Sequence, residues 1–296
     1  MKSNDTDEFL LTQVQNYWKG KNIPQQWYSD KEPLTLQWFN EIRKKRYNLY
    51  YEYLKEEAEF QYHAGEKILE IGVGIGTDLA EFALNGANVT GIDLGEDQVN
   101  LTKLNFTLRN LPYEQISQGN AEGLDFEDGT FDLVYSFGVL HHTPDTQKAI
   151  NEIQRVLKDD GQAIIMLYAK GFKHYIKRCF IHGILLGKLF KNGFSWKKVY
   201  NEVSEVHGDS PKTEVYSKSE IKRMFSNFNQ IEIKKKRLGE FIEYPPYRTF
   251  VLPKCIKNFF IFFGFEYFFG ENWLIKATNA KPPEKISVFE VIFKHY

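Results

Sequence analysis

The stretch that decides the fold reads Lys67-Ile68-Leu69-Glu70-Ile71-Gly72-Val73-Gly74-Ile75-Gly76-Thr77 and continues, after a helical segment, into Asn88-Val89-Thr90-Gly91-Ile92-Asp93. An apolar run ends in alternating glycines, and a second apolar run ends in a carboxylate. This order predicts a strand, a tight loop, a helix and a second strand. Because glycine has no Cβ atom, the backbone of such a loop can adopt left-handed angles and approach a ligand closely.

The ligand of this loop should contain a nucleoside. Asp93 closes the second strand about 20 residues after the glycines, where doubly wound folds bind the hydroxyls of a ribose. A dinucleotide fingerprint would place its third glycine at position 77, but Thr77 stands there and Gly76 comes one residue early. Glu70 would repel a pyrophosphate and would suit an ammonium group. A nucleoside that carries an amino acid, such as S-adenosylmethionine, meets these requirements.

With these residues the chain resembles the class I S-adenosylmethionine-dependent methyltransferases, in particular the type 11 group related to the ubiquinone and menaquinone methylating enzymes. The resemblance covers residues 64–169 and continues more weakly through 217–277. It implies that S-adenosylmethionine is the cofactor and that its methyl group is transferred to an acceptor.

The resemblance also implies which residues contact the cofactor. The glycine loop would lie under the methionine part, and Glu70 would help to hold the ammonium group. Asp93 would bind the ribose, and Leu94 would pack on the adenine ring. The remaining cofactor contacts would come from Gly72, Val73, Gly74 and Gly76 in the loop, Asn120, Ala121 and Glu122 after the third strand, and Phe137 and Gly138 at the end of the fourth. Family members often have aspartate at the position of Asn120, whose amide can both accept and donate a hydrogen bond.

Two adjacent histidines, His141 and His142, follow the fourth strand and are the candidate catalytic residues. Methyl transfer needs alignment of acceptor and methyl group and no metal, but a hydroxyl or carbon acid must also lose a proton. Imidazole titrates near neutral pH and can accept that proton. His142 is frequently histidine in the family whatever the acceptor, which favours a structural role. His141 is therefore the better candidate to face the acceptor.

The rest of the chain predicts a Rossmann-like α/β fold, a doubly wound, mostly parallel sheet of seven strands. Parallel strands need crossover helices, and strands and helices alternate here. The predicted strands are 67–71, 88–92, 114–118, 131–137, 162–168, 230–237 and 272–277, and the predicted helices after the glycine loop are 77–84, 96–109, 146–157 and 217–225. Before them, 33–60 has the pattern of one long amphipathic helix. Residues 1–32 have little regular signal, although Phe9-Leu10-Leu11, Val14, Tyr17 and Trp18 could form one apolar helical face.

We divide the chain into an N-terminal helical cap (1–63), a cofactor-binding core (64–170), a basic amphipathic lid insertion (171–216), the C-terminal part of the core (217–280) and a tail (281–296). The basic insertion has no acidic residue between Lys170 and Tyr200. The C-terminal part contains a second, aromatic insertion (241–270), whose run Phe259–Phe265 is almost entirely aromatic.

Composition narrows the function classes. The 38 basic and 39 acidic residues nearly balance, so no global charge indicates nucleic acid as a partner. The two cysteines have neither paired nor metal-ligand spacing, which indicates a reducing compartment, the cytoplasm. No signal-peptide pattern and no apolar stretch of the roughly 20 residues that span a bilayer is found, which predicts a soluble protein.

The predicted function is methyl transfer to a small hydrophobic or aromatic acceptor, with O- or C-methylation favoured over N-methylation, because aromatic-rich insertions in this fold commonly cover the acceptor. One alternative is a lipid or quinone methyltransferase at the membrane surface, where the basic amphipathic insertion would make a peripheral contact. Another is an NAD-dependent oxidoreductase, against which Thr77 and Glu70 count. The third is a regulatory protein that binds the cofactor without catalysis.

Overall fold

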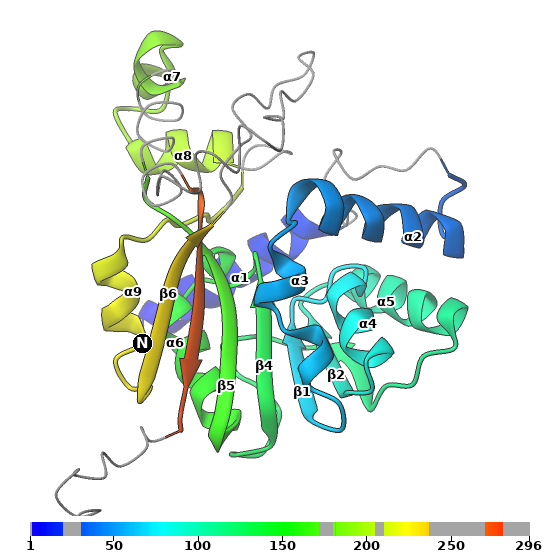
Figure 1. Ribbon diagram of the computed structural model, residues 1–296. Helices are drawn as coiled ribbons and strands as arrows, with labels where there is room; N and C mark the ends of the chain where they lie inside the picture. The colour runs from blue at the N-terminus through cyan, green and yellow to red at the C-terminus, as the bar shows by residue number, and fades with distance from the viewer. Residues whose placement is uncertain are drawn as a thin grey trace, which may run out of the picture.

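The computed structural model describes residues 2–19, 31–171, 180, 182–204, 210–236 and 270–280. Its centre is a sheet of seven strands in the order β3-β2-β1-β4-β5-β7-β6 (Figure 1). The strands are β1 (Lys67–Ile71), β2 (Asn88–Asp93), β3 (Gln115–Gln118), β4 (Phe131–Phe137), β5 (Leu157–Tyr168), β6 (Gln230–Lys236) and β7 (Asn272–Thr278). β1 to β5 pair in parallel, and β7 is antiparallel to both β5 and β6. The predicted Rossmann-like fold class is confirmed.

Helices cover both faces of this sheet, because successive strand residues point to opposite sides. Leu69 packs into a core with α6 (Thr146–Val156) and α9 (Lys218–Met224). Its neighbour Ile68 packs into a second core with α4 (Thr77–Leu84) and α5 (Glu96–Arg109). The strand order reverses between β1 and β4, so the crevice at the carboxyl ends of these strands is where a ligand is expected.

The predicted long helix over 33–60 is wrong, because the segment is broken. It forms α2 (Leu36–Lys45), a π-helical turn (Arg46–Tyr50), α3 (Leu54–Glu57) and a 3₁₀ turn (Phe60–Tyr62). The break has a tertiary cause: within the π-helical turn, Arg46 and Tyr47 both bond the buried carboxylate of Asp78. Upstream, in the segment with little regular signal, the chain forms α1 (Lys2–Trp18).

Smaller differences concern strand ends. β5 begins at Leu157 rather than at residue 162, because Leu157 pairs with Phe131 before the register shifts ahead of Gln162. The predicted turn at 159–161 therefore lies inside the strand. Predicted boundaries of the helices after the glycine loop agree with the structure to within one residue.

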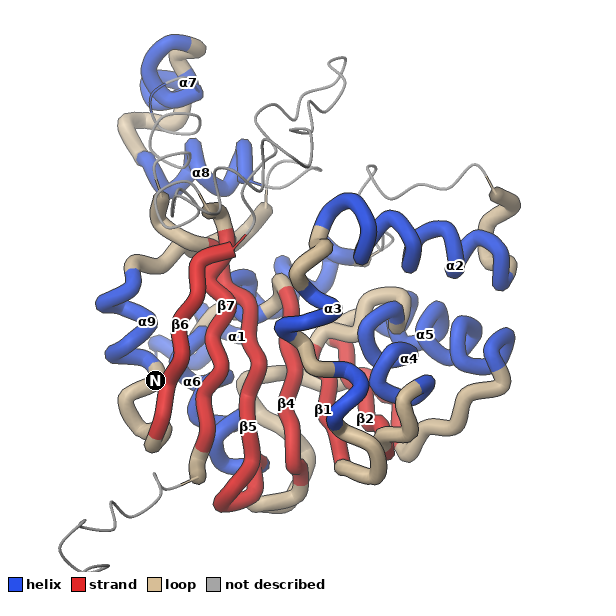
Figure 2. Tube along the Cα trace, in the orientation of Figure 1, coloured by secondary structure: helices blue, strands red, loops and turns tan. Residues whose placement is uncertain are grey.

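The basic insertion emerges from the carboxyl end of β5. Its described part contains α7 (Lys188–Lys191) and α8 (Trp196–Ser204), which stand above the sheet in Figures 1 and 2. The aromatic insertion, apart from Gly270, and the tail at 281–296 lie outside the described residues. The division of the chain into cap, core, insertions and tail stays a prediction.

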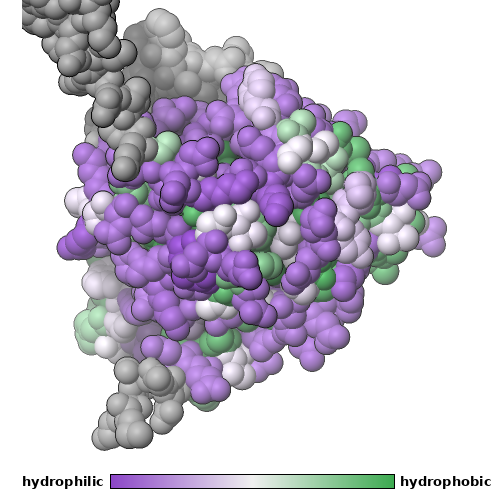
Figure 3. Space-filling model, turned by 90° about the horizontal axis from the view of Figure 1, so that it is seen from below, coloured by the Kyte–Doolittle hydropathy of each residue, from purple (hydrophilic) through white to green (hydrophobic). Residues whose placement is uncertain are grey.

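The opposite end of the molecule, at the amino ends of the parallel strands, is largely hydrophilic in the coloured part of Figure 3, with scattered apolar residues. In the described segments we find no helix long and apolar enough to cross a membrane.

Candidate functional site

The glycine loop after β1 forms the floor of the site. Gly72, Gly74 and Gly76 all have positive φ, at 82°, 57° and 72°. A Cβ atom at Gly72 would lie 2.2 Å from Val139 Cγ2, and one at Gly76 would lie 2.6 Å from Thr102 Cγ2. A Cβ atom at Gly74 would meet no atom within 4 Å. Gly72 and Gly76 are thus required by packing, whereas Gly74 borders open space that a ligand can fill.

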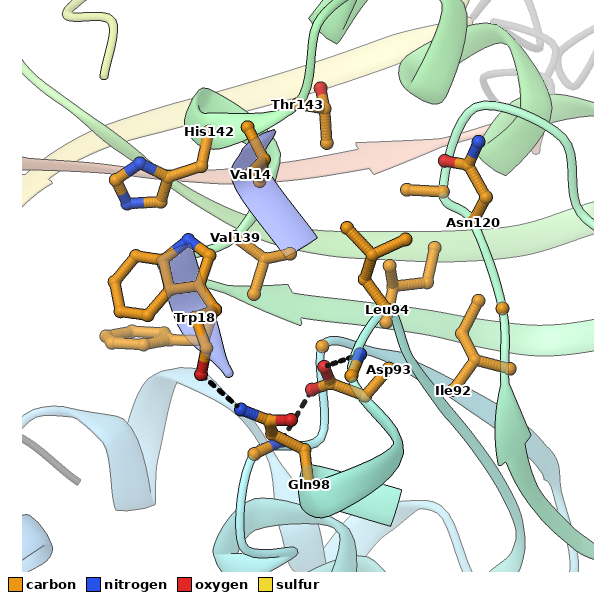
Figure 4. A pocket seen from close by; sticks show the side chains of 18 of the residues that line it. Val14, Trp18, Ile92, Asp93, Leu94, Gln98, Asn120, Val139, His142 and Thr143 are labelled. Atoms are coloured by element: carbon orange, nitrogen blue, oxygen red, sulfur yellow. Dashed lines mark hydrogen bonds between the residues drawn. The ribbon is translucent and has the colours of Figure 1, made fainter. Parts of the chain in front are cut away.

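Asp93 ties the end of β2 to this loop. Its Oδ2 accepts a hydrogen bond from the Gly74 amide and its Oδ1 accepts one from the Gly95 amide, both at 3.0 Å (Figure 4). Burial raises the pKa of Asp93, although these amides favour the ionised form. Each carboxylate oxygen keeps further lone-pair capacity for a ligand.

A cavity of about 260 Å³ lies above the loop, at the carboxyl ends of the parallel strands. Of the residues that the sequence predicted for the site, those in the cavity wall are Gly72, Gly74, Asp93, Leu94, Asn120, Ala121, Phe137, Gly138 and His142. Those outside the wall are Glu70, Val73, Gly76, Glu122 and His141.

Glu122 supports the wall from behind. Its amide donates to Asn120 Oδ1 at 3.0 Å, and its own Oε1 accepts from the Asp145 amide at 2.7 Å. Glu122 therefore links the loop after β3 to the start of α6. Burial raises its pKa.

Glu70 belongs to a buried polar cluster behind the loop. The centre of the cluster is Asp78, whose carboxylate accepts from Arg46 Nε at 2.6 Å, from the Tyr47 hydroxyl at 2.5 Å and from the Tyr135 hydroxyl at 2.8 Å. Burial and the negative charge of Asp78 raise the pKa of Glu70 well above its ordinary value. Glu70 Oε2 has no hydrogen-bond partner within the described part of the chain.

Arg46 connects this cluster to the cavity and was missed by sequence reasoning. It lies in the cavity wall, and its guanidinium carbon is 4.8 Å from the centre of the Phe137 ring. A usable signal existed: Arg46 follows Ile42 by four residues and Phe39 by seven, so a charged residue occupies the apolar face of a predicted helix.

The two histidines have different surroundings. His141 is completely buried and stacks on Tyr168, with ring centres 3.8 Å apart. His142 lies in the cavity wall, its Nδ1 2.9 Å from the Lys212 carbonyl oxygen and 3.3 Å from Thr213 Oγ1. A carbonyl can only accept, so this contact assigns the proton of a neutral ring to Nδ1 and its lone pair to Nε2.

α1 closes the cavity from above, and sequence reasoning did not assign it to the site. Leu11, Val14, Gln15 and Trp18 are in the wall. Gln15 Nε2 donates to the Leu94 carbonyl at 3.0 Å, and Gln98 Nε2 donates to the Trp18 carbonyl at 2.9 Å. The Trp18 ring meets the His142 ring edge to face at 5.1 Å (Figure 4). The only sequence signal was the apolar spacing of Val14, Tyr17 and Trp18.

No group of three or more histidine, cysteine or acidic side chains in the described segments is arranged to hold a metal ion. The site is a partly aromatic cavity whose wall contains a carboxylate, Asp93, an arginine, Arg46, and a histidine, His142.

Known proteins are similar to this chain in sequence and in fold. The methyltransferase domain family matches residues 69–165. An uncharacterized protein of Methanocaldococcus jannaschii is 28% identical over 80% of this chain and 92% of its own length. A ubiquinone biosynthesis O-methyltransferase of Acinetobacter baylyi is 30% identical over 38% of this chain and 48% of its own length. A phosphoethanolamine N-methyltransferase of Caenorhabditis elegans is 36% identical over 36% of this chain and 25% of its own length.

Among solved structures, the YcgJ protein of Bacillus subtilis superposes with a TM-score of 0.51 at 21% identity, covering 74% of this chain and 94% of that one. This likeness shows the fold. The chain spans half or less of the two curated methyltransferases above.

Proposed function

We propose that this chain, which belongs to the class I S-adenosylmethionine-dependent methyltransferases, transfers a methyl group from S-adenosylmethionine to a small hydrophobic or aromatic acceptor in the cavity under α1. The observation that carries the proposal is the cavity itself, because its wall combines Asp93 and the open side of Gly74 with aromatic side chains and His142.

The cofactor fits the residues present. The Asp93 carboxylate would accept the ribose hydroxyls with its remaining lone pairs, and Leu94 and Ala121 would flank the adenine beside Asn120. The open space beside Gly74 would admit the methionine part. Arg46 would pair with the methionine carboxylate, because it is the arginine of the cavity wall and a guanidinium binds carboxylates well. Glu70 lies behind the loop, so it would act on the ammonium group by its charge.

The bound cofactor supplies a methyl group on a positively charged sulfur, which is already activated for displacement. What remains for the protein is to orient the acceptor, exclude water and take a proton. His142 is the proposed base. The acceptor hydroxyl or carbon acid would give its proton to Nε2 of His142, the new bond would form to the methyl carbon, and the carbon–sulfur bond would break to leave S-adenosylhomocysteine.

The position of His142 modifies our expectation from the sequence, which preferred His141. His141 is buried against Tyr168 outside the cavity wall and would act by holding Tyr168 in place. His141 is the alternative candidate for the base.

The acceptor class follows from the remaining wall. Trp18, Tyr51, Phe137 and Tyr168 are aromatic, and these rings favour a flat, apolar molecule. A base on the wall favours acceptors that must lose a proton before they attack, which is why O- or C-methylation is preferred in the proposal over N-methylation.

Incubation of the protein with methyl-labelled S-adenosylmethionine and fractionated cell extract tests the proposal. We expect label in a small apolar compound and loss of labelling in His142→Ala. Label in protein, in nucleic acid or in a polar amine would contradict the proposed acceptor class.

A further inference from the structure

The described part of the basic insertion exposes a concentration of large apolar side chains. Seven such residues between positions 180 and 196 have exposed fractions from 44% to 69%, namely Phe180, Ile184, Leu185, Leu186, Phe190, Phe194 and Trp196. They are half of the 14 large hydrophobic residues found exposed in the described segments. Such a concentration of exposed large apolar side chains in one segment indicates a site of interaction.

The apolar side chains are presented by a folded hairpin. Lys188 Nζ and Asn192 Nδ2 both bond the carboxylate of Glu202, at 2.7 and 2.8 Å, which joins α7 to α8. The Trp196 ring packs directly on the backbone of Gly183, since a Cβ atom there would lie 2.3 Å from Trp196 Cζ3. Val199 and Tyr200 are buried on the inner side. The outward direction of the other side chains is therefore fixed by the hairpin.

Positive charge surrounds these side chains. Lys191, Lys197 and Lys198 are exposed on the same hairpin. Lys188 is paired with Glu202, and the ammonium of Lys197 is 3.8 Å from Glu214 while its side chain remains 69% exposed. The sequence contains no acidic residue between Lys170 and Tyr200, so the carboxylates that meet these lysines, Glu202 and Glu214, come from outside that range. Exposed apolar side chains together with exposed lysines on one hairpin are complementary to an anionic lipid surface.

The hairpin lies at the same edge of the sheet as the cavity. It follows β5, whose last residue, Tyr168, is in the cavity wall. In Figures 1 and 2, α7 and α8 lie beyond the carboxyl ends of the parallel strands, which is the edge that carries the cavity.

We propose that residues 182–198 form a membrane-docking hairpin that inserts Leu185, Leu186, Phe190 and Phe194 into the surface of an anionic bilayer. The occupant of this face is a lipid surface rather than a second copy of the chain, because the exposed lysines of the hairpin, Lys191, Lys197 and Lys198, would repel the same lysines of a second copy. The docking would let an apolar acceptor dissolved in the bilayer reach the cavity from this side. This part of the inference rests on the proposed function.

Co-sedimentation of the full chain with phosphatidylcholine vesicles, with and without phosphatidylglycerol, tests the docking. We expect binding to the anionic vesicles that weakens as salt increases. The variant L185S/F190S/F194S should bind at least about 10-fold more weakly, and so should K191E/K197E/K198E, because apolar insertion and charge both contribute. The matched control Y62S/L84S removes two apolar side chains that are 71% and 49% exposed elsewhere and should bind like the unaltered chain.

Affinity for S-adenosylhomocysteine, measured for each variant, verifies folding, because these residues are outside the cavity wall. Unchanged vesicle binding in both hairpin variants, or no binding by the unaltered chain, would overturn the proposal. So would self-association of the unaltered chain that L185S/F190S/F194S abolishes, since it would assign the face to a second copy. Vesicle binding is measured without methyl transfer, so failure of the proposed acceptor class would leave this result intact.

Discussion

At the residue scale, the buried cluster around Asp78 explains how the loop can receive a cation. Two carboxyl groups, Glu70 and Asp78, lie near one guanidinium, Arg46, and Asp78 takes the direct bonds from that guanidinium. The ionised form of Glu70 is thereby disfavoured by burial and by its neighbour. An ammonium group placed over the loop would supply the missing positive charge.

The first prediction concerns stability. Because the folded-state pKa of Glu70 is raised above its unfolded value, ionisation of Glu70 costs the folded state stability as pH rises above about 4.3. Glu70→Gln should therefore raise the free energy of unfolding of the cofactor-free protein by on the order of 1 kcal/mol at pH 8 and by less at pH 5. Urea denaturation at both pH values measures this. The gain in free energy of unfolding of Glu70→Gln over the unaltered chain should be larger at pH 8 than at pH 5. A smaller gain at pH 8 than at pH 5 would contradict the prediction.

The same substitution should weaken binding of S-adenosylhomocysteine, because the amide cannot supply negative charge to the ammonium group. Calorimetric titration compares the two proteins. Equal affinities would show that Glu70 has no part in cofactor binding.

The second prediction separates the two histidines. His142→Ala should lower turnover about 100-fold or more, as loss of a general base does, and change S-adenosylhomocysteine affinity only a few-fold. His141→Ala should mainly lower stability, because it leaves a void beneath Tyr168. Turnover on the labelled fraction and thermal unfolding are the measurements. A larger loss of turnover in His141→Ala, with affinity and stability retained, would move the base to His141.

At the scale of elements, α1 is the part of the site that depends most on contacts distant in sequence. It is joined to the core through Leu94, Gln98 and His142, none of which is near it in the chain. A helix held in this way can cover a bound cofactor and must release it for exchange.

We therefore expect Trp18→Ala to weaken S-adenosylhomocysteine binding by about 10-fold, mostly through faster dissociation, because this ring covers the cavity. The matched control is Phe9→Ala, on the same helix but 65% exposed. Stopped-flow displacement gives both rates. Equal dissociation rates in the two variants would contradict a covering role for α1.

A further prediction at this scale concerns α9, whose start is a capping box. Ser217 Oγ accepts from the Glu220 amide, and Glu220 Oε2 accepts from the Ser217 amide at 2.7 Å. Ser217→Ala should lower the free energy of unfolding by about 1 kcal/mol. Denaturant unfolding at pH 7 measures it, with Ser219→Ala, inside the helix, as the control.

Glu220 also gives this element a pH dependence. Partial burial opposes its ionisation, but hydrogen bonds from Lys170 and Ser217 outweigh burial and lower the pKa of Glu220 to about 2. Its contribution to stability is therefore complete above about pH 4.3 and is lost as pH falls towards 2. Glu220→Gln should flatten this part of the stability profile, and an unchanged profile would exclude the contribution.

At the scale of the whole molecule, the predictable parts are those whose signals are local. The glycine loop, the strands that flank it and the helices after it were predicted nearly to the residue, because turns, caps and apolar runs encode them. The break at Arg46 and the position of α1 were not, since both depend on tertiary partners, Asp78 for one and the Leu94 region for the other.

The same distinction applies to the site. Residues at the strand ends, such as Asp93 and Asn120, could be predicted because the fold brings strand ends together. Arg46 and Trp18 come from the N-terminal segment and reach the cavity only through packing. His141 and His142 are adjacent in sequence, so only the structure could distinguish the one in the wall from the one behind it.

Calorimetric titration of the full chain with S-adenosylhomocysteine, beside NADH, is the most direct test of the central claim that this cavity holds the methyl donor through Asp93. We predict that S-adenosylhomocysteine binds, that Asp93→Ala weakens it roughly 10- to 100-fold through loss of charge-assisted hydrogen bonds, and that NADH does not compete. Tight NADH binding without S-adenosylhomocysteine binding, or unchanged affinity in Asp93→Ala, would contradict it.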